Sequence, residues 1–145
     1  MITENTATRE AAIDITDVDL ASRDGIERSF EIRCASGRRS MATWRGTPIS
    51  AIVEGTAIPA ETTHLVVASG DGYCACLDVH TALHGLLAVT RDGTPIDEAD
   101  SPRFVAPDIE GIRMVKGVST IEPVSLAPAE DPERFEAFES GTNEQ

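Results

Sequence analysis

The chain has 145 residues, of which 41% are hydrophobic, and this size and composition are those of one folded domain with a single core. Its 25 acidic residues outnumber its 12 basic ones and give a formal net charge of −13, which excludes nucleic acid and anionic lipid as main partners. No apolar run reaches the length of a membrane span, and the first ten residues contain no apolar signal-peptide stretch. We therefore expect a cytoplasmic protein that does not contact a membrane.

The basic residues are unevenly distributed by type, because Lys116 is the only lysine. On a surface this acidic, the carboxylates repel one another in dilute buffer. Salt near 1 M shortens the Debye length to about 3 Å and screens most of this repulsion. The composition therefore predicts a halophilic protein, with an ordinary acidic protein from a high-GC genome as the alternative. A reducing cytosol would keep the three cysteines, Cys34, Cys74 and Cys76, as thiols.

Alternating apolar residues and turn signals predict many strands. Strands are expected at residues 13–20, 29–34, 64–69, 73–77, 85–91, 94–96, 104–105 and 113–121. The hairpin signal is strongest at Asp92-Gly93, because both residues tolerate a positive φ. Short helices are expected at 48–55, where Pro48 suits a first turn and Gly55 a stop, and at 79–84. The predicted fold class is therefore α+β, a strand-rich mixed domain with few short helices.

Domain boundaries follow from where these patterns begin and end. Residues 1–12 show no periodic apolar pattern and are expected to form a flexible tail. Residues 13–126 carry the predicted strands and helices and are expected to form one domain. Residues 127–145 are expected to form an acidic tail.

A short helix is predicted within this acidic tail. Asp131 and Pro132 can open it, and Phe135 and Phe138 then share a face three residues apart. That face could dock on the body of the domain or on a partner.

The segment around Cys34 is the most informative for chemistry. A predicted strand delivers this cysteine to its end, and a loop containing Gly37 then places Arg38 and Arg39 nearby. Neighbouring guanidinium groups favour the thiolate, which is the form that ligates metals or attacks electrophiles. The alternative is a small buried residue that ends a strand, since free cysteine is among the most buried residue types.

Six motifs in order resemble the oxidoreductase molybdopterin-binding domain of the sulfite oxidase family. They are Cys34-Ala35-Ser36-Gly37-Arg38-Arg39-Ser40, Trp44-Arg45-Gly46-Thr47-Pro48, Asp71-Gly72-Tyr73, Leu87-Ala88 with its Asp-Gly turn, the segment 101–107 and Val115-Lys116. The similarity covers roughly residues 30–122. Combined with the acidic composition, it identifies the chain as a short, haloarchaeal-type member with the fold of that family.

The resemblance implies a role for several residues. Cys34 would be a thiolate ligand of molybdenum, and a soft thiolate suits a metal that the pterin already binds through sulfur. The pterin phosphate and oxyanion substrates need cations, for which Arg38, Arg39, Arg103 and Lys116 are the candidates. The implied function is a molybdopterin-dependent oxidoreductase that transfers an oxygen atom or reduces a small oxo-substrate, with an electron-transfer protein as partner. A cofactor-free relative acting as a protein-binding or assembly module is the alternative.

The motif Asp71-Gly72-Tyr73 has two interpretations. In the family it lies close to the cofactor region, which implies that Asp71 binds the cofactor and that Tyr73 is catalytic. The same residues also suit a simple turn, with aspartate and glycine taking the bend and tyrosine packing beside the sheet.

Other chemistry-bearing residues favour structural interpretations. Cys74 and Cys76 face the same side of a predicted strand but lack a second Cys or His pair at zinc-site spacing, so burial is favoured over metal binding. His80 and His84 share a helical face, which by itself is a weak metal signal. Trp44 is interpreted as a packing anchor at a sharp bend rather than a substrate contact.

Overall fold

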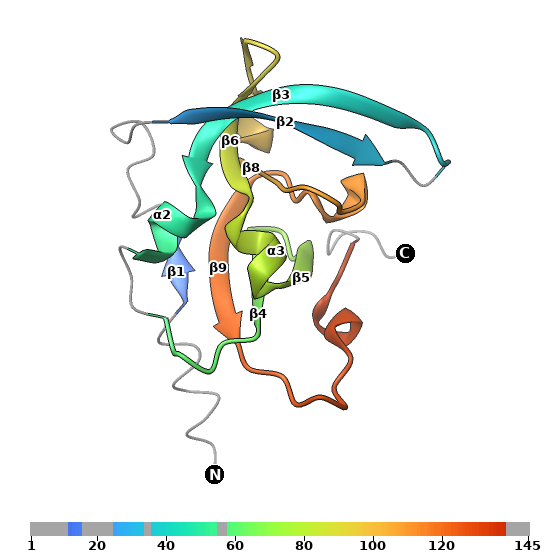
Figure 1. Cartoon of the computed structure of the whole chain (residues 1–145). Helices are drawn as coiled ribbons and strands as arrows, with labels where there is room; N and C mark the ends of the chain where they lie inside the picture. Colours follow the sequence, from blue (N-terminus) through green and yellow to red (C-terminus); the bar gives the residue numbers. More distant parts are fainter. Residues whose placement is uncertain (1–11, 16–24, 34–35, 55–57, 139–145) are drawn as a thin grey trace.

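The structure, a computed structural model, describes residues 12–15, 25–33, 36–54 and 58–138. These residues form two antiparallel sheets that share one hydrophobic core, with two short α-helices beside them (Figure 1). The predicted strand-rich α+β class is confirmed. No helix in these described ranges is long and apolar enough to cross a membrane.

The first sheet has four strands in the order β1-β9-β4-β5. Its strands are β1 (Ile13–Asp14), β4 (His64–Ser69), β5 (Cys74–Asp78) and β9 (Val118–Val124). The predicted strand at 64–69 is confirmed over its whole length. The strand expected at 13–20 is confirmed for its first two residues, and its part from 16 onward lies outside the described residues.

The second sheet runs β2-β3-β6-β7, and β8 pairs with β6. Its strands are β2 (Ile26–Arg33), β3 (Arg39–Pro48), β6 (Leu86–Arg91), β7 (Thr94–Pro95) and β8 (Arg103–Val105). The predicted β6–β7 hairpin is confirmed, since Asp92 and Gly93 both have a positive φ, of 51° and 83°. In Figure 1 the long β2–β3 ribbon lies across one end of the molecule.

Strand β3 was not predicted, and the bend expected at Trp44 falls beside a register shift between Arg45 and Gly46 in the pairing of β3 with β6. The inward positions of this ten-residue strand are Ala42, Trp44 and Gly46, so only one of them is a large apolar residue. Trp44 is fully buried, which confirms its role as a packing anchor. A Cβ on Gly46 would lie 2.0 Å from the carbonyl oxygen of Leu87, so the close approach of β3 to β6 requires glycine here.

The two predicted helices are confirmed as α2 (Ile49–Glu54) and α3 (Val79–Leu83). The side chain of Asp78 caps α3 by accepting hydrogen bonds from the backbone N–H groups of His80 and Thr81. Three 3₁₀ turns are also described, η3 (Glu98–Asp100), η4 (Gly111–Arg113) and η5 (Pro132–Phe135).

The prediction of a strand at 113–121 is wrong about where the strand begins. Residues 111–113 form η4, and β9 begins only at Val118 and continues to Val124. Met114 and Val115 are buried in the segment between these two elements rather than in a sheet. Both belong to the hydrophobic core, and Met114 also lines the cavity described below.

The C-terminal helix is confirmed at its start and shorter than expected. Asp131 accepts a hydrogen bond from the backbone N–H of Glu133, as an N-cap does, but η5 ends at Phe135. Phe138 therefore does not share a helical face with Phe135. Instead the segment after η5 runs beside β5, where Ala137 forms an isolated bridge with Cys74.

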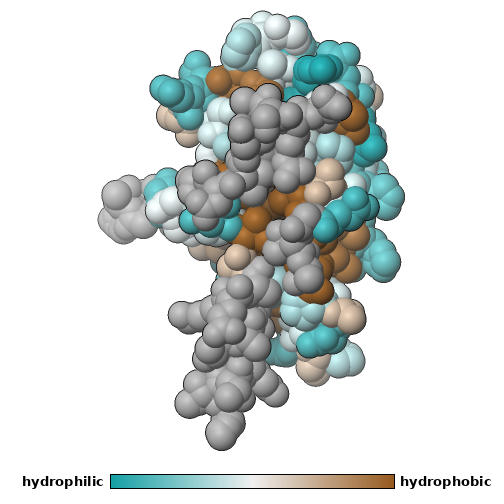
Figure 2. Space-filling view, turned by 90° about the vertical axis from the view of Figure 1, so that its left-hand side faces the viewer, coloured by the Kyte–Doolittle hydropathy of each residue, from teal (hydrophilic) through white to brown (hydrophobic). Residues whose placement is uncertain are grey.

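Hydrophilic residues cover much of the described surface in Figure 2, with hydrophobic residues gathered in the middle of that face. In the described part of the chain the large hydrophobic residues with the highest exposure are Met41, Val89, Ile112 and Phe135. Of these, Ile112 borders the cavity that follows.

Candidate functional site

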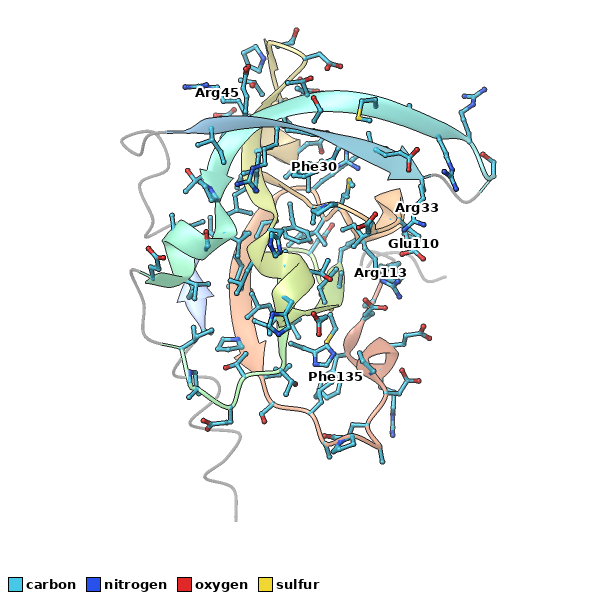
Figure 3. All side chains as sticks on the ribbon, in the orientation of Figure 1. Phe30, Arg33, Arg45, Glu110, Arg113 and Phe135 are labelled. Atoms are coloured by element: carbon cyan, nitrogen blue, oxygen red, sulfur yellow. The ribbon has the colours of Figure 1, made fainter. Side chains whose placement is uncertain are left out.

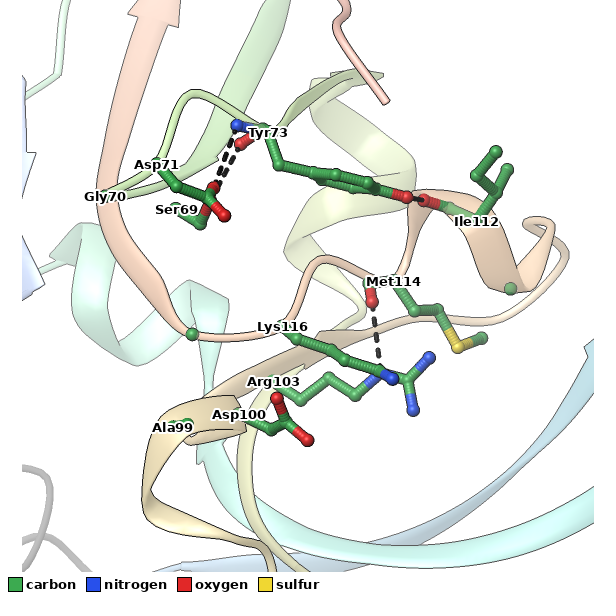
Figure 4. A pocket seen from close by; sticks show the side chains of 12 residues that line it. Ser69, Gly70, Asp71, Tyr73, Ala99, Asp100, Arg103, Ile112, Met114 and Lys116 are labelled. Atoms are coloured by element: carbon green, nitrogen blue, oxygen red, sulfur yellow. Dashed lines mark hydrogen bonds between the residues drawn. The ribbon is translucent and has the colours of Figure 1, made fainter. Parts of the chain in front are cut away.

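A cavity of about 630 Å³ opens where five segments of the chain meet (Figure 4). Its volume lies within the range of small-molecule and cofactor sites. Its described lining residues are Ser69, Gly70, Asp71, Tyr73, Ala99, Asp100, Arg103, Gly111, Ile112, Met114, Lys116 and Gly117. They come from the β4–β5 turn, η3, β8, η4 and the segment before β9.

Four residues predicted from the sequence meet in this cavity: Asp71, Tyr73, Arg103 and Lys116. They are distributed over 46 positions of the chain, from 71 to 116, and the antiparallel sheets bring them together. Ser69 and Asp100 also line the cavity and were not predicted, because polar residues at the end of a strand or in a turn suit ordinary turn chemistry.

Asp71 forms the corner of the β4–β5 turn. Its carboxylate accepts a hydrogen bond from the Ser69 hydroxyl and another, at 3.3 Å, from the backbone N–H of Tyr73. The Ser69 hydrogen bond, followed by the one from Tyr73, holds the pKa of Asp71 below its usual value. The turn interpretation is therefore correct, and the same carboxylate also lines the cavity.

Tyr73 is held by two contacts, one to its hydroxyl and one to its ring. Its hydroxyl donates a hydrogen bond to the carbonyl oxygen of Ile112 at 2.5 Å, which ties the residue before β5 to η4. The Phe138 ring packs against it with 5.6 Å between centroids, and the Arg113 guanidinium lies over that same Phe138 ring. Burial raises the pKa of Tyr73, and Arg103 opposes this shift. The phenol is therefore protonated at neutral pH.

Arg103 forms the cationic part of the wall. Its Nε donates to the carbonyl oxygen of Met114 at 3.0 Å, which orients the guanidinium, and its other two nitrogens have no acceptor among the described residues. Burial lowers the pKa of Arg103, and the neighbouring Arg91 adds to that shift. A guanidinium remains charged at neutral pH nonetheless.

Lys116 is presented by a tight turn. Gly117 has a φ of 64°, and its N–H donates to the carbonyl oxygen of Asp100 at 3.0 Å. A Cβ at Gly117 would lie 2.9 Å from the carbonyl oxygen of Ala99, so this turn favours glycine. In Figure 4 Lys116, Arg103 and Asp100 lie along the same side of the cavity.

The segment that carries the predicted metal ligand is only partly described. Cys34 lies outside the described residues, so its role stays a prediction. Strand β2 ends at Arg33, which bridges to Glu110, and the carbonyl oxygen of Arg33 lies 3.5 Å from where a Cβ on Gly111 would stand. Gly111 lines the cavity, so β2 ends beside the cavity wall.

Arg38 and Arg39 do not line this cavity. Both are exposed at the end of the β2–β3 ribbon, and Arg39 lies 3.7 Å from the carboxylate of Glu31 across that ribbon. The pair therefore sits apart from Arg103 and Lys116.

Cys74 and Cys76 are structural in their described surroundings. The Cys76 side chain is buried, and burial followed by the nearby Glu136 carboxylate raises the pKa of this thiol to about 12. Burial likewise raises the pKa of Cys74, whose thiol lies 3.2 Å from the carbonyl oxygen of Phe135. No group of three or more His, Cys, Asp or Glu side chains in the described ranges could hold a metal ion.

Of the two histidines at α3, His84 at the C-cap has its ring engaged with the backbone. Nδ1 of His84 lies 2.8 Å from the carbonyl oxygen of His80, one helical turn earlier. This contact gives the pair a local structural role.

The chain belongs to the oxidoreductase molybdopterin binding domain family, whose model matches residues 8–130. Among solved structures it is similar to a chain of the crystal structure of the sulfane dehydrogenase SoxCD from Paracoccus pantotrophus, with a TM-score of 0.67 and 18% sequence identity. The match covers 77% of this chain and 35% of that chain, so the domain spans about a third of its solved relative. At this identity the likeness shows the fold. The search of curated protein sequences found no match. The family resemblance inferred from the six motifs is thus confirmed.

Proposed function

We propose that this domain binds a molybdopterin cofactor in the 630 Å³ cavity and serves as a molybdenum-dependent oxidoreductase that transfers an oxygen atom or reduces a small oxo-substrate. The observation that carries the proposal is the convergence of Arg103 and Lys116 on an open cavity in a member of this family. When bound, the cofactor would supply two-electron redox chemistry at the metal.

The donor set of the cavity fits such a group. A pterin bears amino and ring N–H groups that need acceptors, and a phosphate that needs cations. The Asp71 carboxylate and the Asp100 carboxylate supply acceptors, while Arg103 and Lys116 supply the cations. Arg103 keeps two guanidinium nitrogens without an acceptor among the described residues, so it retains donors for an anionic ligand.

The candidate site residues would have different roles in binding and catalysis. Arg103 and Lys116 would hold anionic groups of the cofactor or the substrate, and Asp71 would orient the pterin ring. Tyr73, packed against Phe138, would line the wall with a protonated phenol whose one hydroxyl hydrogen is donated to Ile112, so it would act on a substrate oxygen by exchanging that hydrogen bond for one to the substrate. Cys34 would ligate the metal, which is supported by the end of β2 beside the cavity wall.

The cofactor-free alternative is less favoured by this structure. A relative that has lost its cofactor and serves only as a binding module is expected to fill the vacated space with side chains, because protein interiors are closely packed. Here the space beside Arg103 and Lys116 is open. We therefore favour the enzyme, with an electron-transfer protein as the second reactant.

Metal content tests this proposal. Protein purified from its native host, or from a host that loads another member of the family, is expected to contain about one molybdenum per chain and to release a fluorescent pterin. Cys34→Ser is expected to lose most of the molybdenum, and Arg103→Gln to lower the pterin content. Cys74→Ser is the matched control, because it removes a thiol that lies beside Phe135, and should retain both. Absence of molybdenum in the wild type under loading conditions would refute the proposal.

A further inference from the structure

The C-terminal segment after η5 reaches the candidate site at Tyr73 (Figure 1). Tyr73 lines the 630 Å³ cavity and Phe138 does not, so the Phe138 ring contacts the tyrosine from outside that cavity. Both side chains are partly buried and pack against the hydrophobic core. We propose that Phe138 is a positioning residue for Tyr73, which it holds in the cavity wall by packing on the phenol ring from behind.

Pairing between the C-terminal segment and β5 sets this contact. Cys74 and Ala137 form an antiparallel bridge, in which each N–H donates to the other residue's carbonyl oxygen, at 2.7 and 2.9 Å. In an antiparallel pair, the residues next to such a hydrogen-bonded pair also lie opposite each other, with their side chains closer together. Tyr73 and Phe138 are these neighbours. Their ring centroids accordingly lie 5.6 Å apart, which is within the range of favourable aromatic pairs.

The segment that carries Phe138 is attached by contacts that do not involve the Phe138 ring. The Glu136 carboxylate accepts hydrogen bonds from the Arg113 side chain at 2.8 and 3.0 Å and from the backbone N–H of Cys76 at 2.9 Å. The backbone bridge to β5 adds to these contacts. Removing the ring should therefore leave the segment on β5 and take away the cover of Tyr73 alone.

The hydroxyl end of Tyr73 has a contact that can be exchanged. The hydroxyl donates to the carbonyl oxygen of Ile112, and an acceptor on a ligand in the cavity could take that hydrogen bond instead. When the hydroxyl changes its acceptor, the ring needs a second contact to keep its place. Among the described residues, its ring contact is with Phe138. This use of the hydroxyl rests on the proposed function, whereas the placement of the ring by Phe138 does not.

The C-terminal segment also shapes the electrostatic environment of the phenol. Burial is the main cause that raises the pKa of Tyr73, Arg103 opposes this shift, and Glu136 adds to it. Phe138 contributes to that burial because its ring lies against the phenol. Loss of the Phe138 ring should therefore let water reach the phenol and lower the pKa of Tyr73 toward its ordinary value.

The state of Tyr73 can be measured directly, because it is the only tyrosine of the chain. The whole chain is produced without molybdenum and with meta-fluorotyrosine in place of tyrosine, and fluorine NMR follows the label against pH. Fluorotyrosine ionises at lower pH than tyrosine, so the titration stays closer to neutral pH. In Phe138→Ala we expect the fluorine resonance to move toward that of the free amino acid and the pKa of the phenol to fall.

Two further variants separate the ring contact from general effects on the segment. Phe138→Leu keeps an apolar side chain against Tyr73 and should restore most of the wild-type resonance position and pKa. Phe135→Ala is the matched control, because it removes the same ring from the same segment. Phe135 is 38% exposed, and the ring contact of Tyr73 is with Phe138. We expect Phe135→Ala to titrate as the wild type does.

Labelling of Cys76 shows whether the segment stays in place. This thiol is buried, so slow reaction with N-ethylmaleimide, mapped by mass spectrometry, reports a docked segment. The inference is overturned if Phe138→Ala keeps Cys76 protected and the Tyr73 pKa unchanged, or if Phe135→Ala lowers that pKa equally.

Phe138→Leu decides the case in which Phe138→Ala exposes Cys76. A protected Cys76 with a pKa near that of the wild type supports the inference. A protected Cys76 with the pKa of the alanine variant overturns it, and so does an exposed Cys76, because Phe138 would then hold the segment rather than the tyrosine. Failure of the molybdenum test would leave these results untouched, because the metal is not present in them.

Discussion

Arg103 and Arg113 lie ten residues apart and show two different uses of a cation. Arg113 donates to the Glu136 carboxylate at 2.8 and 3.0 Å and to Glu110 at 2.8 Å. The Glu136 hydrogen bonds raise the pKa of Arg113, whereas burial lowers the pKa of Arg103. We call Glu110, Arg113 and Glu136 the clamp, and Arg91, Arg103 and Lys116 the cationic wall.

The difference separates a structural cation from one that is available to a ligand. The clamp fastens the C-terminal segment onto β5, since Glu136 also accepts from the backbone N–H of Cys76 at 2.9 Å. Figure 3 shows Arg113 and Glu110 beside Arg33 at the end of β2. The cationic wall has no comparable contacts. Among the described residues its guanidiniums form one hydrogen bond, from Arg103 to the carbonyl oxygen of Met114. We infer that the clamp contributes mainly stability and the wall mainly binding.

The largest expected effect is at Glu136. Its side chain is 3% exposed and accepts three hydrogen bonds, so Glu136→Ala leaves the Cys76 N–H and much of the Arg113 guanidinium without an acceptor. We expect a loss of about 2–3 kcal/mol in the free energy of unfolding, measured with urea.

Glu133 provides the matched control for this substitution. Its carboxylate lies 3.9 Å from the same Arg113 guanidinium but is 74% exposed. Glu133→Ala is therefore expected to cost less than about 0.5 kcal/mol. Equal losses in the two variants would mean that the burial of Glu136 does not matter and that the clamp is an ordinary surface ion pair.

The sequence predicted the secondary-structure elements better than the tertiary contacts between them. The strand at 64–69 and the turn at Asp92-Gly93 follow from an apolar run and from turn chemistry that act locally. Strand β3 was missed because two of its three buried alternating positions are Ala42 and Gly46, whose small side chains carry little apolar signal. The clamp was missed because its partners lie 23 residues apart and meet only after folding.

The candidate site shows the same limit. Asp71, Tyr73, Arg103 and Lys116 were found through the family motifs and do line one cavity. Arg91, the neighbour of Arg103, was missed, because a cation before an Asp-Gly turn is unremarkable in sequence. Only the pairing of β3 with β6 places it opposite Trp44.

A smaller effect is expected when the wall loses a charge. Arg91→Gln removes a cation from the face of Trp44 but also relieves the repulsion between Arg91 and Arg103. The free energy of unfolding in chloride buffer should therefore stay within about 0.5 kcal/mol of the wild type. Arg113→Gln, which leaves the buried Glu136 carboxylate unpaired, should lose about 2 kcal/mol in the same buffer. Similar losses in both would show that the wall is structural as well.

The smallest effect concerns the acid limb of stability. A hydrogen bond from its own backbone N–H, and then the attraction of Arg113, lower the pKa of Glu110 from its usual 4.5. Because the pKa is lower in the folded state, this contribution is present above about pH 4.5 and is lost as the pH falls through the folded value.

Glu110→Gln removes that contribution. The carboxylate is 54% exposed, so solvent screening limits the expected loss at pH 7 to less than about 0.5 kcal/mol, and the variant and the wild type should differ less at pH 3 than at pH 7. Urea unfolding at both pH values measures the difference. In an Arg113→Gln background the substitution should cost still less, because the attraction of the guanidinium is already gone. A loss that is independent of pH and of Arg113 would place Glu110 outside the clamp.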